Sequence, residues 1–393
     1  MSFALSAVQI VLGILLTAFV FYSGLMLWAA RKWAHAQAAL TPEYLPCVTI
    51  LKPVRGVDAH AYANFVSFCR LNYPADRVQI VFSALDSDDP ALDLAERLRA
   101  EFPERDIAVL RPGPSAVRGP NRKVCNLAAM LPTAKHDLLV LCDSDMRVAP
   151  DYLRRLVAPF RPNESETGRG VGLVTCPYRG SGPESLPAAL EALGIGADFI
   201  PSALISRALE GVSFAFGSTI ALPKAVLVEL GGFEALFDEL ADDFRLGDGA
   251  AKAGYTVVLS DVVVETVLGA ERFGPMWSRR LRWARTVRSC RPAGYAGAVI
   301  THGVALALMF LLASGLALYG WLVFGTVLLL RLGVALFVAL RYTHDPNIAR
   351  FLPLLPLSDL LGFALYIGSY CGSRIIWRGE RFRLLAGGKL QRE

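Results

Sequence analysis

Two glycine-rich phosphate-binding patterns are missing from this sequence. No G-x-G-x-x-G follows the first predicted strand, which argues against a domain that binds NAD or FAD. No G-x-x-x-x-G-K-[ST] occurs either, which excludes a P-loop nucleotidase. Any nucleotide site in this chain would therefore have to rely on carboxylates and a metal ion.

Charged residues and paired cysteines are also scarce. Only 19% of the 393 residues are charged and 54% are hydrophobic, which indicates membrane segments. The seven cysteines are scattered without a C-x-x-C pair, which favours reduced thiols over disulfides or zinc. Much of the net charge of +5 lies in residues 279–291 and the C-terminal tail, beside predicted membrane segments. Anionic lipid headgroups explain this charge better than nucleic acid does.

The N-terminal segment is apolar and ends in positive charge. Residues 7–30 carry no charge, which is long enough to cross a hydrocarbon core of ~30 Å, and Arg31 and Lys32 follow directly. Because positive charge marks the cytoplasmic side, we expect an N-terminal transmembrane anchor over 1–31 with the rest of the chain inside. A cleaved signal peptide is the alternative, but it would need a basic start and a shorter apolar run.

The C-terminal part, 298–393, forms a second apolar region. Residues 299–340 divide into two predicted spans, whereas 351–371 contain Pro353, Pro356 and Asp359 and precede a basic tail. Counting three spans would place the tail outside, but the positive charges favour a cytoplasmic tail. We therefore expect 351–371 to be a re-entrant or interfacial element, with backbone broken by proline.

Residues 32–297 read as one cytoplasmic domain in which strands and helices alternate. Strands are predicted at 47–54, 78–86, 106–112 and 137–143, with helices around 60–71, 90–102 and 123–134. This alternation predicts an α/β fold, a parallel sheet covered by helices. In open sheets of this kind ligands bind beyond the carboxyl ends of the strands.

Acidic residues mark two of those strand ends. Asp86 and Asp143 each end a predicted strand, and we expect them to face one crevice. Asp145 follows Asp143 by two residues, so strand geometry would point both carboxylates the same way. Such a pair suits Mg²⁺ or Mn²⁺ with substrate phosphates. Taken alone, Asp-x-Asp equally predicts a polar turn at a strand end.

Two later motifs carry charge on predicted helices. Asp242 and Asp243 open a predicted helix, either as functional acids or as ordinary helix-start residues. Farther on, arginines recur at three-residue spacing along a second helix, beside a tryptophan. Guanidinium groups suit phosphate oxygens, although a solvated basic juxtamembrane helix is the alternative. The residues of this second motif are Arg279, Arg282, Trp283, Arg285 and Arg288.

Together these pieces resemble the D, D, D, (Q/R)-x-x-R-W signature of membrane-bound inverting GT-A glycosyltransferases of families 2 and 21. The similarity is closer to ceramide glucosyltransferases, on the stretches ILKPVRGVD, NRKVCNL and ADDF. It runs from about residue 48 to 297 and includes the apolar ends. Bacterial transferases that put N-acetylglucosamine on hopanoids share NRKV, FGSTIAL, LADD and LRWAR. The resemblance therefore leaves the lipid acceptor open between ceramide and a hopanoid.

The resemblance implies a GT-A (Rossmann-like) domain that binds a UDP-sugar and a divalent cation, Mn²⁺ or Mg²⁺. It implies that Asp243 acts as general base on the primary hydroxyl of the lipid, and that one displacement inverts the sugar. The expected product is β-glucosylceramide, made from UDP-glucose. The expected donor contacts are Lys52, Pro53, Asp86, Lys123 and Asp143, with the cation on Asp143 and Asp145, and with Arg279, Arg282 and Trp283 at the departing diphosphate.

One departure from the family pattern concerns the acceptor side. Where these families usually carry a histidine, the stretch LGIGADFIPS offers Asp198. We expect Asp198 and Asp242 on the acceptor side, and the segment 193–209 as an interfacial helix lining the lipid entrance or as a core helix. The hopanoid relatives are bacterial, so the expected location is a bacterial inner membrane with the catalytic domain in the cytoplasm.

Other function classes fit the sequence less well. A processive polysaccharide synthase shares the signature, but this chain has few spans to form a polymer channel. A dolichyl-phosphate sugar synthase would normally lack the R-x-x-R-W element. A membrane scaffold without activity would leave three separate acidic sites unexplained.

Overall fold

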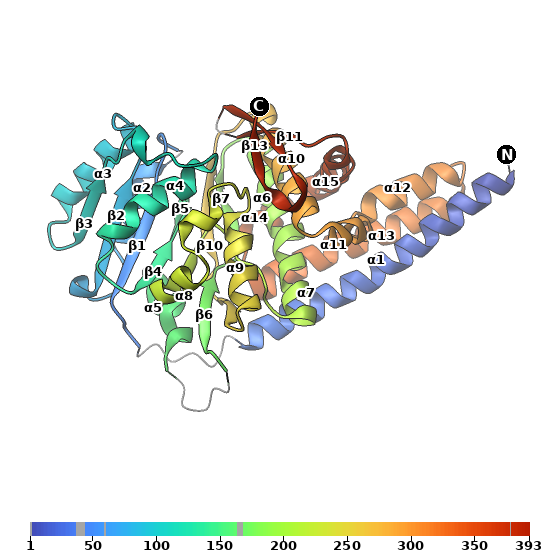
Figure 1. Cartoon of the computed structure of the whole chain (residues 1–393). Helices are drawn as coiled ribbons and strands as arrows, with labels where there is room; N and C mark the ends of the chain where they lie inside the picture. The colour runs from blue at the N-terminus through green and yellow to red at the C-terminus, as the bar shows by residue number, and fades with distance from the viewer. Residues whose placement is uncertain (1, 37–43, 59, 163–167, 378) are drawn as a thin grey trace. The chain divides into compact units, whose positions relative to one another are not determined.

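The computed structural model describes residues 2–36, 44–58, 60–162, 168–377 and 379–393 (Figure 1). The chain forms two compact units. The helical unit comprises Met1–Ala36, Pro183–Leu209 and Ala270–Gly387, and the sheet unit comprises Gln37–Gly182, Glu210–Gly269 and Gly388–Glu393. Residues 183–209 and 270–297 group with the apolar helices.

A seven-stranded sheet with strand order β3-β2-β1-β4-β8-β6-β9 forms the centre of the sheet unit. The four strands expected from the sequence are present and parallel, as β1 (Val48–Pro53), β2 (Val78–Ser83), β3 (Asp106–Leu110) and β4 (Leu138–Leu141). Next to them, β8 (Ile220–Pro223) runs antiparallel to both β4 and β6 (Val171–Thr175), and β9 (Thr256–Leu259) is parallel to β6. The predicted α/β fold class is confirmed.

Helices cover both faces of this sheet because successive strand side chains point to opposite faces. Ile50 packs into one core and the next residue, Leu51, packs into the other. The first core receives α2 (Ala61–Cys69), α3 (Pro90–Glu101) and α5 (Tyr152–Val157). The second core receives α4 (Arg122–Met130), α8 (Lys224–Glu229) and α9 (Asp242–Lys252). The expected helices at 60–71, 90–102 and 123–134 are thus α2, α3 and α4.

A small sheet of β5 (Met146–Arg147), β10 (Val264–Gly269) and β7 (Tyr178–Pro183) lies beyond the end of β4. β4 ends at Leu141, so Asp143 and Asp145 lie in the turn between β4 and β5. The expectation that strand geometry points both carboxylates the same way is therefore wrong. At the end of the chain, β13 (Leu390–Arg392) joins the sheet unit, where the Leu390 N–H donates to the Asp238 carbonyl at 2.7 Å.

Three apolar helices pack side by side in the helical unit, as Figure 1 shows: α1 (Ser2–Ala36), α12 (Gly303–Ala313) and α13 (Leu318–Val338). Leu16, Leu306 and Val327 belong to their shared core. Gly303 allows close approach, because a Cβ there would lie 2.6 Å from the Phe19 ring. The predicted N-terminal apolar helix is present and continues past residue 31.

The other elements of the helical unit begin with a nearly continuous helical run, α6 (Leu186–Gly194), a π-helical turn (Ile195–Phe199) and α7 (Ile200–Glu210). In the most apolar stretch of this run, 83% of the residues are buried. This burial favours the core-helix alternative for 193–209 over the interfacial one. The remaining elements are α10 (Phe273–Cys290), α11 (Pro292–Gly297), α14 (Pro346–Arg350), α15 (Leu355–Tyr370) and the hairpin of β11 (Arg374–Trp377) and β12 (Glu380–Leu384).

By length and composition, four of the described helices could cross a membrane: Ser6–His35, Leu186–Glu210, Leu318–Thr343 and Leu352–Tyr370. Pro353 and Pro356 lie in the first turns of the last helix, where proline does not interrupt the hydrogen bonding. The predicted break of the backbone by proline at 351–371 is therefore wrong. The bend lies instead between Pro292–Thr301 and Gly303–Ala313, at 61°.

Candidate active site

Lys123 lies at the centre of the polar cluster in the sheet unit. It stands in the first turn of α4, whose N-cap residue Asn121 accepts a hydrogen bond from the Val124 N–H. The Lys123 Nζ lies 2.7 Å from Asp143 Oδ1 and 3.5 Å from Asp242 Oδ2. Burial lowers the pKa of Lys123, but the surrounding carboxylates outweigh it and raise the pKa above its usual value. The ammonium is therefore a fixed positive charge.

Asp242 and Asp243 begin α9, as expected from the sequence. Asp242 is buried, and its Oδ1 lies 3.3 Å from the Asn121 side-chain nitrogen, which also donates to the Glu239 carbonyl at 2.8 Å. Asp243 accepts two backbone hydrogen bonds, from Gly217 at 2.9 Å and from Phe244 at 2.8 Å. The bond from Phe244 satisfies a free N–H of the first helical turn, so the helix-start interpretation holds in part.

The pKa of the Asp243 carboxyl is raised above its usual range. Burial raises its pKa to about 6, and the neighbouring charge of Asp242 adds to this effect. Lys123 and the two backbone N–H groups act in the opposite direction. A carboxyl with a pKa in this range is suited to accept a proton from a substrate under physiological conditions.

Gly217 is a site residue that sequence reasoning missed. A Cβ at this position would lie 3.0 Å from Asp143 Oδ2, 3.1 Å from Lys123 Nζ and 3.5 Å from Asp243 Oδ2. The absence of a side chain therefore lets these three groups converge around one point of backbone. The FGSTIAL stretch contains this glycine, but its spacing to the acids gave no signal of the contact.

Asp86 and Asp143 are linked to adjacent residues of α4. Arg122 Nη2 lies 2.8 Å from Asp86 Oδ1, and the following residue, Lys123, pairs with Asp143. Asp86 comes three residues after β2, and Asp143 two residues after β4. The expected convergence of these two strand ends is thus seen in the structure, and Arg122 is a further residue that was not foreseen.

Lys52 occupies a different position from the one expected of a donor contact. Its side chain is 0% exposed, and its Nζ donates to the Asp143 carbonyl at 2.8 Å and lies 3.9 Å from the centre of the Phe68 ring. Burial lowers its pKa. Lys52 therefore fixes the turn that carries Asp143, and its contact with the donor stays a prediction. Pro53 follows it as the last residue of β1.

Asp145 is the second acid of the Asp-x-Asp pair. Its Oδ2 accepts a hydrogen bond from Thr266 Oγ1 of β10 at 2.7 Å. Burial raises its pKa, with a further contribution from Asp143. No group of three or more His, Cys, Asp or Glu residues among the described ranges is placed to hold a metal. Two carboxylates still fit Mg²⁺ or Mn²⁺, because these ions complete their coordination with water and substrate phosphate oxygens.

The cluster carries an excess of negative charge. When ionised, Asp143, Asp242 and Asp243 contribute three negative charges, and Lys123 contributes one positive charge, which leaves a net charge of −2. Such a site repels a bare diphosphate but attracts a divalent cation. The charges of these side chains therefore agree with the cation expected from the sequence.

In the helical unit, Arg279 is held by two glutamates. Its Nη1 lies 2.6 Å from Glu271 Oε1 and its Nε lies 3.1 Å from Glu191 Oε1, and its Nη2 also contacts both carboxylates. Glu191 is 2% exposed. The trio has a net charge of −1, so the positive charge of Arg279 is already compensated. Arg279 therefore clamps Glu191 and Glu271 together, and its role at a diphosphate stays a prediction.

The other members of the basic motif lie along α10 as predicted but meet different partners. The Arg282 guanidinium lies 5.6 Å from the Trp377 ring centre, and the Trp283 ring lies 5.8 Å from the Arg279 guanidinium. Arg285 donates to the Cys371 carbonyl at 2.9 Å, and Arg288 to the Gly372 carbonyl at 3.3 Å. The arginines of the motif thus contact different groups in the structure.

Asp198 belongs to the π-helical turn of the helical unit. It pairs with Arg331, which also forms a two-bond ion pair with Asp359 at 2.8 Å. Arg331 and Asp359 are 3% and 2% exposed, whereas the Asp198 side chain is 36% exposed. Arg331, which interrupts the apolar run, therefore forms an ion pair between α13 and α15. Asp198 is the partly exposed member of this group.

Comparisons with known proteins agree with this architecture. The model of glycosyl transferase family 21 matches residues 11–390. Ceramide glucosyltransferase 1 of Caenorhabditis elegans is 21% identical over 359 residues, 88% of this chain and 73% of its own length. A ceramide glucosyltransferase of Candida albicans is 32% identical over 125 residues, 30% of this chain and 23% of its own length.

Among solved structures, a mannosyltransferase from Pyrobaculum calidifontis in complex with GDP-Man and Mn²⁺ is similar at 20% sequence identity. The match covers 93% of this chain and 98% of that one, with a TM-score of 0.56. This likeness supports the GT-A glycosyltransferase fold. Since the family model spans nearly the whole sequence, the chain is a membrane-associated glycosyltransferase that belongs to glycosyl transferase family 21.

Proposed function

We propose that this protein transfers glucose from UDP-glucose to the primary hydroxyl of ceramide and inverts the anomeric centre, which gives β-glucosylceramide. The observation that carries the proposal is the position of the Asp243 carboxyl, whose pKa is raised to about 6. Only the backbone of Gly217 lies between this carboxyl and the Lys123–Asp143 pair. The names of the family relatives support ceramide as the acceptor and glucose as the sugar.

The donor would bind at the ends of β2 and β4, where Asp86, Lys123 and Asp143 lie. Asp143 and Asp145 would hold Mn²⁺ or Mg²⁺, which when bound neutralises charge on the diphosphate of the donor. The net charge of −2 in the cluster supports a need for this cation. Lys52 would act indirectly, because it fixes the backbone of Asp143.

Asp243 would take the proton from the lipid hydroxyl as the oxygen attacks the anomeric carbon. The new bond forms between that oxygen and the carbon, the bond to the diphosphate breaks, and UDP leaves with its electron pair. One displacement of this kind converts an α-linked donor into a β-glycoside, whereas retention would require a second, covalent step. Asp242 would keep the pKa of Asp243 high through its negative charge.

Arg282 and Trp283 are proposed to act on the departing diphosphate, as the R-x-x-R-W resemblance implies. A guanidinium group suits developing phosphate charge. Arg279 would support them by fixing α10 through Glu191 and Glu271. In this proposal the first arginine of the motif is a positioning residue.

The lipid acceptor would reach the enzyme from the bilayer, since four of the described helices are long and apolar enough to span it. The location we propose is a bacterial inner membrane with the sheet unit in the cytoplasm, because Arg31 and Lys32 follow the first apolar run. Asp198 is the acceptor-side candidate, as its carboxylate is partly exposed beside Arg331.

A hopanoid that receives N-acetylglucosamine from UDP-N-acetylglucosamine is the second candidate. The stretch FGSTIAL, which contains Gly217, is shared with the hopanoid transferases. A processive polysaccharide synthase is the third and least favoured candidate.

The test is mass spectrometry of the lipids that the purified protein makes from each acceptor. Ceramide and a hopanoid are each offered with UDP-glucose, UDP-galactose and UDP-N-acetylglucosamine. Hexosylceramide from UDP-glucose alone supports the proposal, and a β-linkage in its NMR spectrum supports inversion. A glycosylated hopanoid without glucosylceramide would establish the second candidate instead.

A further inference from the structure

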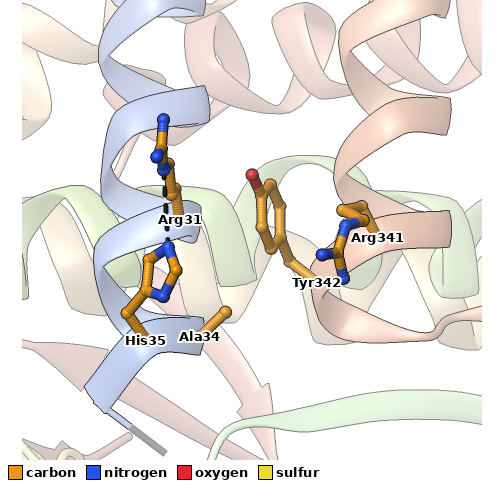
Figure 2. A pocket seen from close by; sticks show the side chains of 5 residues that line it. All are labelled: Arg31, Ala34, His35, Arg341 and Tyr342. Atoms are coloured by element: carbon orange, nitrogen blue, oxygen red, sulfur yellow. Dashed lines mark hydrogen bonds between the residues drawn. The ribbon is translucent and has the colours of Figure 1, made fainter.

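A cavity lined by cationic side chains lies where two apolar helices end. It has a volume of about 370 Å³, and its lining residues are Arg31, Ala34, His35, Arg341 and Tyr342 (Figure 2). The first three belong to the last turns of α1, and the other two to the π-helical turn (Ala339–Thr343) that follows α13. None of the lining residues is acidic.

The positive charges in this cavity are not balanced by acids. Arg31 Nε donates to His35 Nε2 at 3.4 Å, and the Arg341 guanidinium lies 6.0 Å from the Tyr342 ring centre. In the ranges that the structure describes, no carboxylate forms an ion pair with Arg31 or Arg341. Arg331, ten residues before Arg341 on the same helical run, pairs with two carboxylates.

The surroundings of the cavity indicate a ligand with an apolar part. Leu340, next to Arg341, is 61% exposed, and Phe337, one turn before it, is 51% exposed. On α1, Trp28 is 46% exposed and lies 5.1 Å from the Lys32 ammonium, which is typical of a helix at a membrane interface. Exposed apolar surface therefore continues from the cavity along both helices.

We propose that this cavity binds the phosphate of an anionic membrane phospholipid, whose acyl chains lie along the exposed apolar surfaces of α1 and α13. Arg31 and Arg341 would approach the phosphate from two helices, and the Tyr342 hydroxyl, which points between them in Figure 2, would add a hydrogen-bond donor. Basic pockets between membrane helices are suited to lipid headgroups of this class. None of the cavity's lining residues belongs to the proposed active site.

Two variants test different parts of the proposal. Arg31→Gln with Arg341→Gln removes both charges, and Ala34→Phe keeps the charges but fills the cavity. The matched control is Arg97→Gln with Arg99→Gln, which makes the same change in net charge on α3 of the sheet unit, where both arginines form surface pairs with glutamates. Circular dichroism and size exclusion establish that each variant is folded.

The measurement is native mass spectrometry of the full-length protein, titrated with phosphatidylglycerol or phosphatidylcholine and, in competition, with inorganic phosphate. Wild type and the control should bind phosphatidylglycerol more tightly than phosphatidylcholine. The double variant should bind phosphatidylglycerol roughly thirtyfold more weakly, which corresponds to about 1 kcal/mol for each basic group. Ala34→Phe should also lose tight binding.

Three results would overturn the proposal. Unchanged affinity in both the double variant and Ala34→Phe would remove the cavity from lipid binding. An equal loss in the control would mean that overall charge, not this cavity, attracts the lipid. Displacement by inorganic phosphate at concentrations equal to the lipid would identify a soluble anion as the ligand.

Discussion

The Gly217 N–H donates to Asp243 Oδ2 at 2.9 Å, and the same glycine has no side chain to hold Asp143 and Lys123 away from that carboxylate. This relationship joins the proposed base to the proposed donor site through one residue of backbone. A single methyl group added at Gly217 can therefore be used to probe the geometry of the site.

Gly217→Ala should keep the fold and reduce transfer. The added Cβ would lie 3.0 Å from Asp143 Oδ2 and 3.1 Å from Lys123 Nζ, so both groups must move by a few tenths of an ångström. We expect a loss in kcat/KM of about tenfold, because catalytic groups depend on precise placement. The control is Gly274→Ala, where a Cβ meets nothing within 4 Å. Equal rates in the two variants would separate Gly217 from catalysis.

Asp143→Ala should abolish cation-dependent donor binding. One carboxylate fewer weakens the hold on the cation and leaves the diphosphate charge poorly compensated. Calorimetry with UDP and Mn²⁺ measures this, with and without a chelator. The charge-matched control is Asp106→Ala, whose carboxylate pairs with Lys135 on the surface. If Asp143→Ala binds UDP and Mn²⁺ like wild type, Asp143 is not part of the donor site.

Arg279 and Arg282 should respond differently to substitution. Arg279→Gln leaves Glu191, which is 2% exposed, buried without its partner, and should destabilise the protein by about 3 kcal/mol, seen as a lower Tm. Arg282→Ala should keep the Tm and lower kcat by about 10², the usual loss for one charge-stabilising group. If Arg282→Ala strongly lowers the Tm but the protein that remains folded turns over normally, Arg282 has a structural role and not the catalytic one assigned here.

The rate of transfer should fall as the pH is lowered, because Asp243 becomes protonated. Its pKa is raised to about 6, so the deprotonated base predominates above this pH and is lost as the pH falls through it. Asp242→Asn removes a negative charge that raises this pKa, and should shift the acid limb of kcat to lower pH. Asp248→Asn on the same helix, which removes an acid paired with Lys252, should leave the limb in place. An unshifted limb in Asp242→Asn would contradict the coupling.

The sequence predicted the parallel strands, their covering helices and the acids at their ends, because each is encoded by local patterns of a few residues. β8 beside β4 was not predicted, since its antiparallel pairing depends on contacts far apart in the chain. Lys52 was assigned to the donor because of its motif, although its position within an apolar strand makes burial the simpler expectation.

The clamp on Arg279 could not be predicted because Glu191 lies 88 residues earlier in an apolar helix. Gly217 could not be predicted as a site residue, because its role is to leave space for neighbouring side chains. Such a role has no recognisable spacing in the sequence. The prediction of a proline break at 351–371 failed for a different reason. The effect of Pro353 and Pro356 depends on whether they lie in the first turn or the interior of a helix, and the sequence does not define that boundary well.

Asp243→Asn tests the central claim most directly. Asparagine keeps one acceptor oxygen for the two backbone N–H groups, so the variant should fold with a loss of about 1 kcal/mol and bind UDP-glucose and Mn²⁺ nearly as wild type. It cannot take the hydroxyl proton, and transfer of glucose to ceramide should fall by a factor of roughly 10²–10⁴. Asp242→Asn, the matched control, should be affected more mildly. Near-normal transfer by Asp243→Asn would contradict the account, and would identify Asp242 as the base if Asp242→Asn is inactive.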